Sequence, residues 1–257
     1  MRRFFLLILL SLFLFYCGDL DRDNPLDPKN PKSNVERAIL AELFVNDSTS
    51  YDYCNFALDA MEKLSQQNEF KGKLFVLEYH LTNRTSDWDD VYALDECNQR
   101  YYNYVSNSNE RGIPDAFFNG KAARVQGASR ENIDHRYLTA AQNFLGLKSY
   151  FGIEGTKKIF NNSIQLTISI ARYGNSWEDD IEVNAVLYED LESARHRYVV
   201  RKIFQPQTIT TIKPGGIKSL TFTEPLPQFQ HIENLYLMVI LQDKNGPTKE
   251  VYQVAKF

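Results

Sequence analysis

Two hydrophobic periodicities divide this chain of 257 residues and limit the folds that it can adopt. Before about residue 149, apolar runs of strand length alternate with segments whose apolar residues recur at helical spacing. After about residue 150 the helical spacing is absent, and apolar residues alternate with polar ones, as between Ile164 and Ile170. With 43% hydrophobic residues the chain can build a sizeable core. We therefore predict an α/β domain at 35–149 followed by an all-β domain at 150–257.

Strands and helices are expected in the order β-α-β-α-β-β-α within the first of these domains. The expected strands are Ala38–Val45, Leu74–Leu81, Asp115–Phe118 and Lys121–Val125, and the expected helices are Tyr53–Gln67, Asp89–Val105 and Ser129–Leu145. Strand–helix–strand units imply parallel pairing. The Asn119-Gly120 dipeptide is a hairpin-type turn, so it adds an antiparallel strand at the edge.

The second domain is predicted to be an antiparallel, immunoglobulin-like β-sandwich, because short strands follow one another without a helix. The expected strands are Ile164–Ile170, Ile181–Tyr188, His196–Phe204, Thr208–Ile212, Ile217–Thr223, Leu235–Gln242 and Lys249–Val254. Turns rich in Gly, Pro and Asn separate several of them, as in the Lys213-Pro214-Gly215-Gly216 segment.

The N-terminus has the features of an export signal. Arg2 and Arg3 precede an apolar run, Phe4–Tyr16, which is too short to span a bilayer comfortably and ends at Cys17. An apolar run that ends directly in Cys is typical of bacterial lipoproteins, although a small residue is more usual than Tyr16 before the Cys. We predict a signal peptide at 1–16 and lipidation of Cys17. A plain secretory signal and an uncleaved anchor are the alternatives.

Residues 17–34 read as a flexible tether between the lipid and the folded domains. Asp, Asn, Pro and Lys dominate this segment, and Pro25, Pro28 and Pro31 keep it extended. The predicted location is the bacterial cell envelope, at the outer membrane or the periplasmic face, with the membrane as a partner through the lipid. The formal charge is −4 and no basic block occurs, so nucleic acid is not an expected partner.

Five short motifs follow one another along the first domain: Glu42-Leu43-Phe44, Tyr51-Asp52-Tyr53-Cys54, Leu77-Glu78-Tyr79-His80, Gly112-Ile113-Pro114 and Phe117-Phe118-Asn119-Gly120. They resemble the motifs of thioredoxin-like lipoproteins of the bacterial envelope, in which a Cys-Pro-Tyr-Cys type motif opens the first helix. The C-terminal β-domain is similar in layout, so the resemblance covers most of the chain. It implies a thioredoxin-like domain at 35–149 and a cis-proline at Pro114.

The chain departs from this family at the residue that performs the chemistry. If Cys54 occupies the second Cys position, Tyr51 occupies the first, where the family has its nucleophile. Tyr51 cannot attack a disulfide, and the negative charge of Asp52 disfavours a nearby thiolate. We therefore expect no catalytic residue. Pro114 then has two interpretations, a wall of a peptide-binding groove or a structural requirement of its loop, and the structural one is preferred.

The remaining cysteines and the histidines give no further site. Because an exported chain can hold a disulfide, a bridge between Cys54 and Cys97 stays open. The alternative is that Cys54 packs as a small apolar residue. The histidines are His80, His135, His196 and His231, and none pairs with another at metal-ligand spacing. The sequence therefore predicts neither a metal site nor a cofactor.

The leading hypothesis is an envelope lipoprotein with a redox-inactive thioredoxin-like domain that binds or scaffolds a protein partner. The alternative is a divergent thiol-disulfide oxidoreductase or isomerase that uses Cys54, with Cys97 as a second thiol. A third interpretation is a structural subunit of a larger envelope complex. Fold alone does not choose between them, because both scaffolds host many functions.

Overall fold

The computed structural model describes residues 23–30, 33–47, 52–82, 90–160, 162–174, 178–193, 196–226 and 232–257. The predicted signal peptide at 1–16, the predicted lipidation site Cys17 and the motif residue Tyr51 lie outside the described residues. Within these ranges, no helix combines the length and the hydrophobicity needed to cross a membrane.

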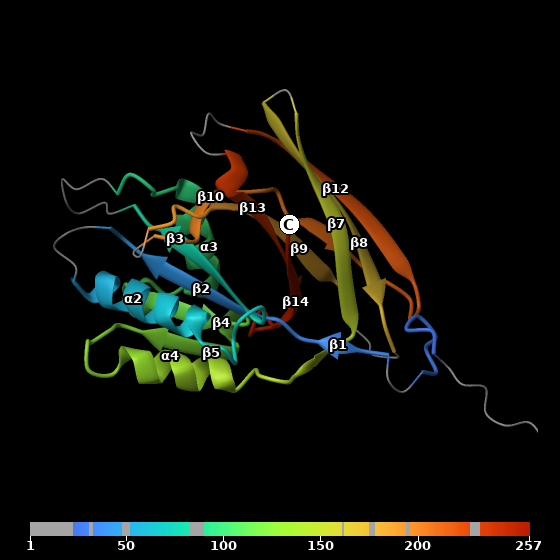
Figure 1. The fold of residues 1–257 in the computed structure, drawn as a ribbon, viewed down its shortest axis with the longest axis horizontal. Helices are drawn as coiled ribbons and strands as arrows, with labels where there is room; N and C mark the ends of the chain where they lie inside the picture. Colours follow the sequence, from blue (N-terminus) through green and yellow to red (C-terminus); the bar gives the residue numbers. More distant parts are fainter. Residues whose placement is uncertain are drawn as a thin grey trace, which may run out of the picture.

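A mixed sheet of nine strands, counted over the described residues, forms the centre of the molecule (Figure 1). Its strands lie in the order β14-β13-β9-β10-β3-β2-β4-β5, and β11 pairs with β9. The bounds are β2 (Ile39–Val45), β3 (Leu74–His80), β4 (Asp115–Phe118), β5 (Ala123–Gln126), β9 (Ile181–Glu189), β10 (Val199–Ile203), β11 (Gln207–Ile209), β13 (Leu235–Asp243) and β14 (Val251–Lys256). Strand β3 is parallel to both of its neighbours, β2 and β10, whereas the other pairs are antiparallel.

Helices cover both faces of the sheet around β2. Their bounds are α2 (Asp52–Gln66), α3 (Asp95–Tyr104) and α4 (Ile133–Gln142). Helices α2 and α4 pack on one face, in a cluster with Ala41 and Leu43 of β2. Helix α3 packs on the other face with Leu40 and Phe44. Because successive strand residues point to opposite faces, the burial of every residue of β2 requires a cover on both sides.

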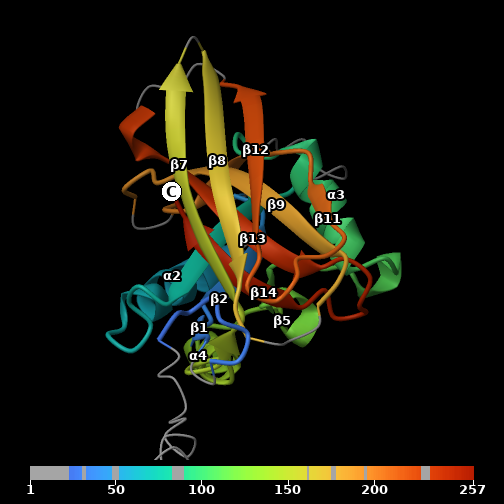
Figure 2. The same cartoon turned by 90° about the vertical axis from the view of Figure 1, so that its right-hand side faces the viewer.

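A second sheet, also formed by the C-terminal half, packs face to face with β9 and β13 of the central sheet. It consists of β7 (Phe151–Phe160), β8 (Ser163–Arg172) and β12 (Ile217–Pro225), all antiparallel, and Figure 2 shows these three long strands side by side. The alternating apolar side chains between Ile164 and Ile170 are buried against the inward residues of β9 and β13. The predicted combination of an α/β part with a β-rich part is therefore confirmed.

Short elements complete the fold. Strands β1 (Val35–Glu36) and β6 (Lys148–Ser149) form a small ribbon, and the 3-10 helices are η1 (Ser108–Glu110), η2 (Gly120–Ala122) and η3 (Ile232–Asn234). Helix α4 begins later than the predicted Ser129, because the backbone first forms a turn in which the amides of Asn132 and Ile133 both donate to the Ser129 carbonyl. Strand β10 begins at Val199, later than the predicted His196, because bends at Arg197 and Tyr198 precede it.

Part of the predicted tether lies against the folded body. Its backbone forms successive turns, in which the amides of Asp27 and Asn30 donate to the carbonyls of Asn24 and Asp27. Gly215, in the turn before β12, has a φ of +77°, and a Cβ there would collide with the Leu26 carbonyl oxygen. Only glycine combines this backbone conformation with such a close approach. The tether therefore meets the body beside the start of β12.

One junction joins the strands before and after the predicted boundary at residue 150. The amide of Glu78 in β3 donates to the Tyr198 carbonyl over 2.8 Å, and Val199 of β10 pairs with Glu78 in register. The Glu78 side chain strengthens the same contact, since its Oε1 accepts from the amides of Arg197 and Tyr198 at 3.2 and 3.3 Å. Strands of both halves consequently share one sheet.

A buried ion pair of the N-terminal half lies on the α3 side of this sheet, and a hydrogen bond from Gln242 links it to the C-terminal half. The Arg100 Nε atom of α3 lies 2.6 Å from the Glu42 Oε1 atom of β2. Arg100 also donates to the Tyr104 hydroxyl, which donates in turn to Glu42 Oε2. The side chain of Gln242 in β13 donates to the same hydroxyl over 2.9 Å. The carboxylate and the hydrogen bonds compensate for the burial of the Arg100 charge.

Replacing Glu42 by Gln should destabilise the protein strongly. Glu42→Gln preserves the side-chain shape but leaves the buried Arg100 guanidinium without its counter-charge, which costs about 3–5 kcal/mol in comparable cases. Urea unfolding of the two proteins would measure the difference. The matched control is Asp134→Asn, which removes an exposed pair with Lys63 and should cost less than ~1 kcal/mol. Equal costs for the two variants would contradict this account of the Arg100 contacts.

Candidate functional site

The Cys54 thiol lies beneath the first turn of α2, in the cluster between that helix and the sheet. Its exposed fraction is 1%. Burial raises the pKa of this thiol to about 11, and the carboxylates of Asp90 and Asp47 also raise it, against the opposing effect of a backbone hydrogen bond from Asn46. A thiol with this pKa is protonated at neutral pH and is a poor nucleophile. Cys54 therefore packs as a small apolar residue.

Cys97 lies on the other face of the sheet, in α3, and is also buried. Burial raises its pKa strongly, and the neighbouring Glu96 carboxylate adds to the shift. Cys54 and Cys97 are both free thiols, so the bridge that the sequence leaves open is not formed. The physical reason is that the sheet separates the two clusters to which they belong.

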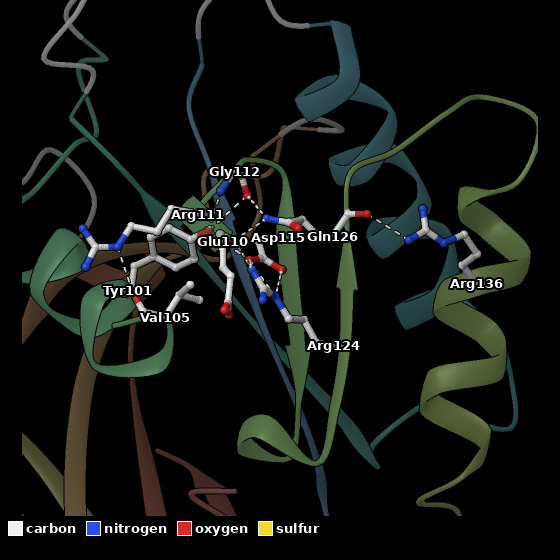
Figure 3. A network of polar contacts seen from close by, with 9 residues as sticks. All are labelled: Tyr101, Val105, Glu110, Arg111, Gly112, Asp115, Arg124, Gln126 and Arg136. Atoms are coloured by element: carbon white, nitrogen blue, oxygen red, sulfur yellow. Dashed lines mark hydrogen bonds and ion pairs between the residues drawn. The ribbon is translucent and has the colours of Figure 1, made fainter. Parts of the chain in front are cut away.

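The Ile113–Pro114 peptide bond is cis, and Pro114 directly precedes β4. Polar contacts hold the loop before it (Figure 3). The Tyr101 hydroxyl donates to Asp115 Oδ2 over 2.9 Å and accepts from the Gly112 amide over 3.0 Å, while Arg124 Nη2 lies 2.7 Å from Asp115 Oδ2. These contacts are internal to the fold, which favours a structural role for Pro114.

A second group of polar side chains gathers where the parallel strands β2 and β3 end. His80 is the last residue of β3, Asp47 follows the end of β2, and Asp90 and His196 approach from the segments before α3 and β10. Glu78 lies two positions before His80, on the same face of β3. The carboxyl ends of parallel strands are a common place for ligand sites.

Each of the two imidazoles has a carboxylate on its outer nitrogen. His80 Nδ1 lies 2.8 Å from Asp90 Oδ2, and His196 Nε2 lies 3.3 Å from Asp47 Oδ1. Asp90 is itself fixed, because its Oδ2 accepts from the Asp47 amide over 2.7 Å and its Oδ1 accepts from the Tyr92 amide over 2.9 Å. The two rings are consequently oriented with their other nitrogens free of hydrogen bonds.

Three buried atoms of this group converge without hydrogen-bond partners: Glu78 Oε2, His80 Nε2 and His196 Nδ1. Glu78 Oε2 lies 3.9 Å from His80 Nε2 and 3.8 Å from His196 Nδ1, and all three atoms lie within 4.8 Å of one another. The exposed fractions of these residues are 5%, 0% and 7%. We call this group the His–Glu cluster. Its composition, two imidazoles and a carboxylate, matches sites that hold a metal ion.

The carboxylates control the charge of the cluster. Burial is the largest single influence on His80 and lowers its pKa, but Asp90 and Glu78 together outweigh burial and raise the pKa to about 9. Burial likewise opposes the ionisation of Glu78, yet its contacts with His196 and His80 hold its pKa below the usual range. In the metal-free protein the two carboxylates therefore favour the protonated form of His80 at neutral pH.

The sequence did not reveal this cluster, because His80 and His196 are far apart along the chain, whereas metal-ligand motifs are recognised by local spacing. The prediction of no metal site therefore overlooked a group of metal-ligating residues that the fold brings together. In the sequence, His80 lies next to the end of one predicted strand, Leu74–Leu81, and His196 begins another. Parallel pairing in full register would place these two residues at opposite ends of the strands. The offset register, in which Val199 of β10 pairs with Glu78 of β3, brings them together.

Comparisons with known proteins give similarity of fold alone. No protein-family model and no curated protein matches the sequence. Among solved structures, HBP35 of Porphyromonas gingivalis is similar with a TM-score of 0.63 and 10% identity, over 86% of this chain and 75% of that chain. A domain of the outer membrane lipoprotein Omp28 from Porphyromonas gingivalis matches with a TM-score of 0.33 and 17% identity, over 42% of this chain and 86% of that chain. The likeness to HBP35 shows a shared fold over most of the chain.

Cys54 and Cys97 should resist alkylation in the folded protein. Both thiols are buried with raised pKa values, so iodoacetamide at neutral pH should modify them only after denaturation. Peptide-level mass spectrometry would report each site. Tyr53→Cys is the matched control, because Tyr53 lies next to Cys54 in α2 with 58% of its surface exposed, and its substitution should label readily. Native labelling of Cys54 as fast as that of the control would refute the inert assignment.

Proposed function

We propose that this protein is a lipid-anchored component of the bacterial cell envelope, in which a thioredoxin-like domain and an immunoglobulin-like β-sandwich bind or scaffold a protein partner. The proposal excludes thiol–disulfide exchange. The observation that carries it is the state of Cys54, a buried and protonated thiol on the helix where the family has its reactive motif.

The topology supports a thioredoxin-like assignment of the first half. The chain order β2-α2-β3-α3-β4-β5-α4 and the sheet order β3-β2-β4-β5 place α2 and α4 on one face and α3 on the other. The cis bond before Pro114 lies at the start of β4, where the resemblance of the Gly112-Ile113-Pro114 loop implies it. Together these features match the arrangement that the sequence motifs imply.

Loss of exchange chemistry follows from three residues. Exchange needs an accessible thiolate that attacks a disulfide and a second thiol that resolves the mixed disulfide. By the alignment of motifs, Tyr51 takes the place of the first thiol. Cys54 is protonated, and Cys97 lies across the sheet, so it cannot act as a substitute partner. Binding then remains as the function that this frame can serve.

The proposed envelope location depends on the sequence at the N-terminus. In this proposal, the apolar run before Cys17 is the export signal, Cys17 is the lipid acceptor, and 17–34 is the tether. The described part of the tether leaves the body beside β12. In this arrangement the membrane is the partner of the lipid, and a protein partner would bind to the folded domains.

Exchange activity should be absent from the wild-type protein and restored by one substitution. Tyr51→Cys would pair a new thiol with Cys54 at the spacing of the family motif. We expect the oxidised variant to contain one disulfide between positions 51 and 54. In its dithiol form, regenerated by dithiothreitol, the variant should reduce insulin measurably above the wild-type background. Insulin turbidity and peptide mass spectrometry would report the two results.

The register control is Asp52→Cys, which places the thiol one position away and should restore no exchange. Wild-type reduction of insulin at a thioredoxin-like rate would refute the proposal and favour a divergent oxidoreductase. Failure of Tyr51→Cys to form the disulfide would refute the assignment of Tyr51 to the nucleophile position.

A further inference from the structure

We propose that Glu78, His80 and His196 form a binding site for a divalent first-row transition metal ion, which we identify as Zn²⁺. This site is independent of the proposed envelope function. It depends only on the His–Glu cluster, which lies where β3 ends and where the chain enters β10.

The unpartnered atoms carry the inference. Buried polar atoms are nearly always hydrogen-bonded, yet this cluster leaves Glu78 Oε2, His80 Nε2 and His196 Nδ1 without partners within a single region. Each of these atoms is a metal-ligand atom, and a cation between them would satisfy all three at once. Two imidazole nitrogens and one carboxylate oxygen form a common zinc ligand set.

The surroundings of the cluster resemble the outer shell of a metal site. Histidine ligands usually donate their second N–H to a carboxylate, which fixes the ring and increases its basicity. His80 has Asp90 in this position at 2.8 Å, and His196 has Asp47 at 3.3 Å. Glu78 Oε1 is occupied by two backbone amides, so its Oε2 atom is directed to the imidazoles.

An aromatic wall closes one side of the cluster. The Tyr92 ring lies 5.2 Å from the His80 ring and 5.2 Å from the His196 ring, measured between centroids. The Arg201 guanidinium lies 5.0 Å from the centroid of the same Tyr92 ring. An apolar wall of this kind limits solvent access and strengthens the interaction between a metal ion and its ligands.

The three ligand atoms lie within 4.8 Å of one another, close to the spacing around a small cation. At zinc–ligand distances of ~2.0–2.2 Å, tetrahedral ligand atoms lie roughly 3.3–3.6 Å apart. The two measured separations to Glu78 Oε2 are 3.9 and 3.8 Å, so each must shorten by a few tenths of an ångström. Rotation of side chains can supply this movement. Ca²⁺ is not expected, because it prefers six to eight oxygen ligands.

A metal here would connect the two halves of the chain. Glu78 and His80 belong to β3, whereas His196 belongs to the segment that enters β10. Bound Zn²⁺ would therefore reinforce the junction between these strands. Its open coordination position could in addition bind a partner or a substrate. Binding to the folded state alone would raise the thermal unfolding temperature.

The test measures zinc binding by the tag-free full-length protein. We expect about one Zn²⁺ per chain by mass spectrometry of the dialysed protein, visible absorption typical of tetrahedral Co²⁺ after substitution, and no response to Ca²⁺. Glu78→Gln and His196→Ala should each weaken Zn²⁺ binding by more than ~100-fold, since loss of even an outer-shell partner costs roughly 10–100-fold. Each variant should also lose the zinc-dependent rise in unfolding temperature.

The matched control is His135→Ala, which removes an exposed histidine of α4 and should bind Zn²⁺ as the wild type does. Circular dichroism of the metal-free variants would establish that each is folded. If one of these variants does not fold, Asp90→Asn takes its place. This substitution should weaken Zn²⁺ binding about 10–100-fold, because Asp90 orients the His80 ring. Absence of stoichiometric Zn²⁺ in the wild type, or equal binding by the wild type and the cluster variants, would overturn the proposal.

Discussion

The pairing of β3 with β10 is the interaction on which the rest of the structure depends. It is short, with Glu78 bonded to Tyr198 through the backbone and to the Arg197 and Tyr198 amides through its carboxylate. Without it, the antiparallel strands β14-β13-β9-β10 and the strands β3-β2-β4-β5 would form two separate sheets. The junction therefore makes one sheet from two halves that differ in their hydrophobic pattern.

The same junction determines where chemistry can occur. It directs His196 to the end of β3, beside His80. Glu78 Oε1 accepts the backbone hydrogen bonds of the junction, whereas Glu78 Oε2 faces both imidazoles. The Cys54 thiol lies near the same Asp47 and Asp90 carboxylates, which raise its pKa together with burial. An acidic environment that suits cationic ligands thus disfavours a thiolate. The Asp90 carboxylate thus contributes both to the raised pKa of Cys54 and to the raised pKa of His80.

Local patterns predicted the elements of this fold but not its junctions. The alternation of apolar and polar residues at Ile164–Ile170 was sufficient to predict strand β8, because the inward residues of this strand are buried and the outward ones are not. The α/β order was likewise readable, since β2 is apolar except for Glu42 and α2 has helical spacing. The contact between β3 and β10 could not be predicted, because it depends on two segments far apart in the chain. The Glu42–Arg100 pair was hidden for the same reason.

Hydrogen exchange at the junction tests the central claim most directly. The account predicts that the Glu78 and Tyr198 amides exchange as slowly as the amides of β2, since both sets would open only with the shared sheet. Saturation with Zn²⁺ should slow the two junction amides further. Rapid exchange of Glu78 and Tyr198 beside a protected β2, unchanged by Zn²⁺, would contradict both the single sheet and the metal site that it assembles.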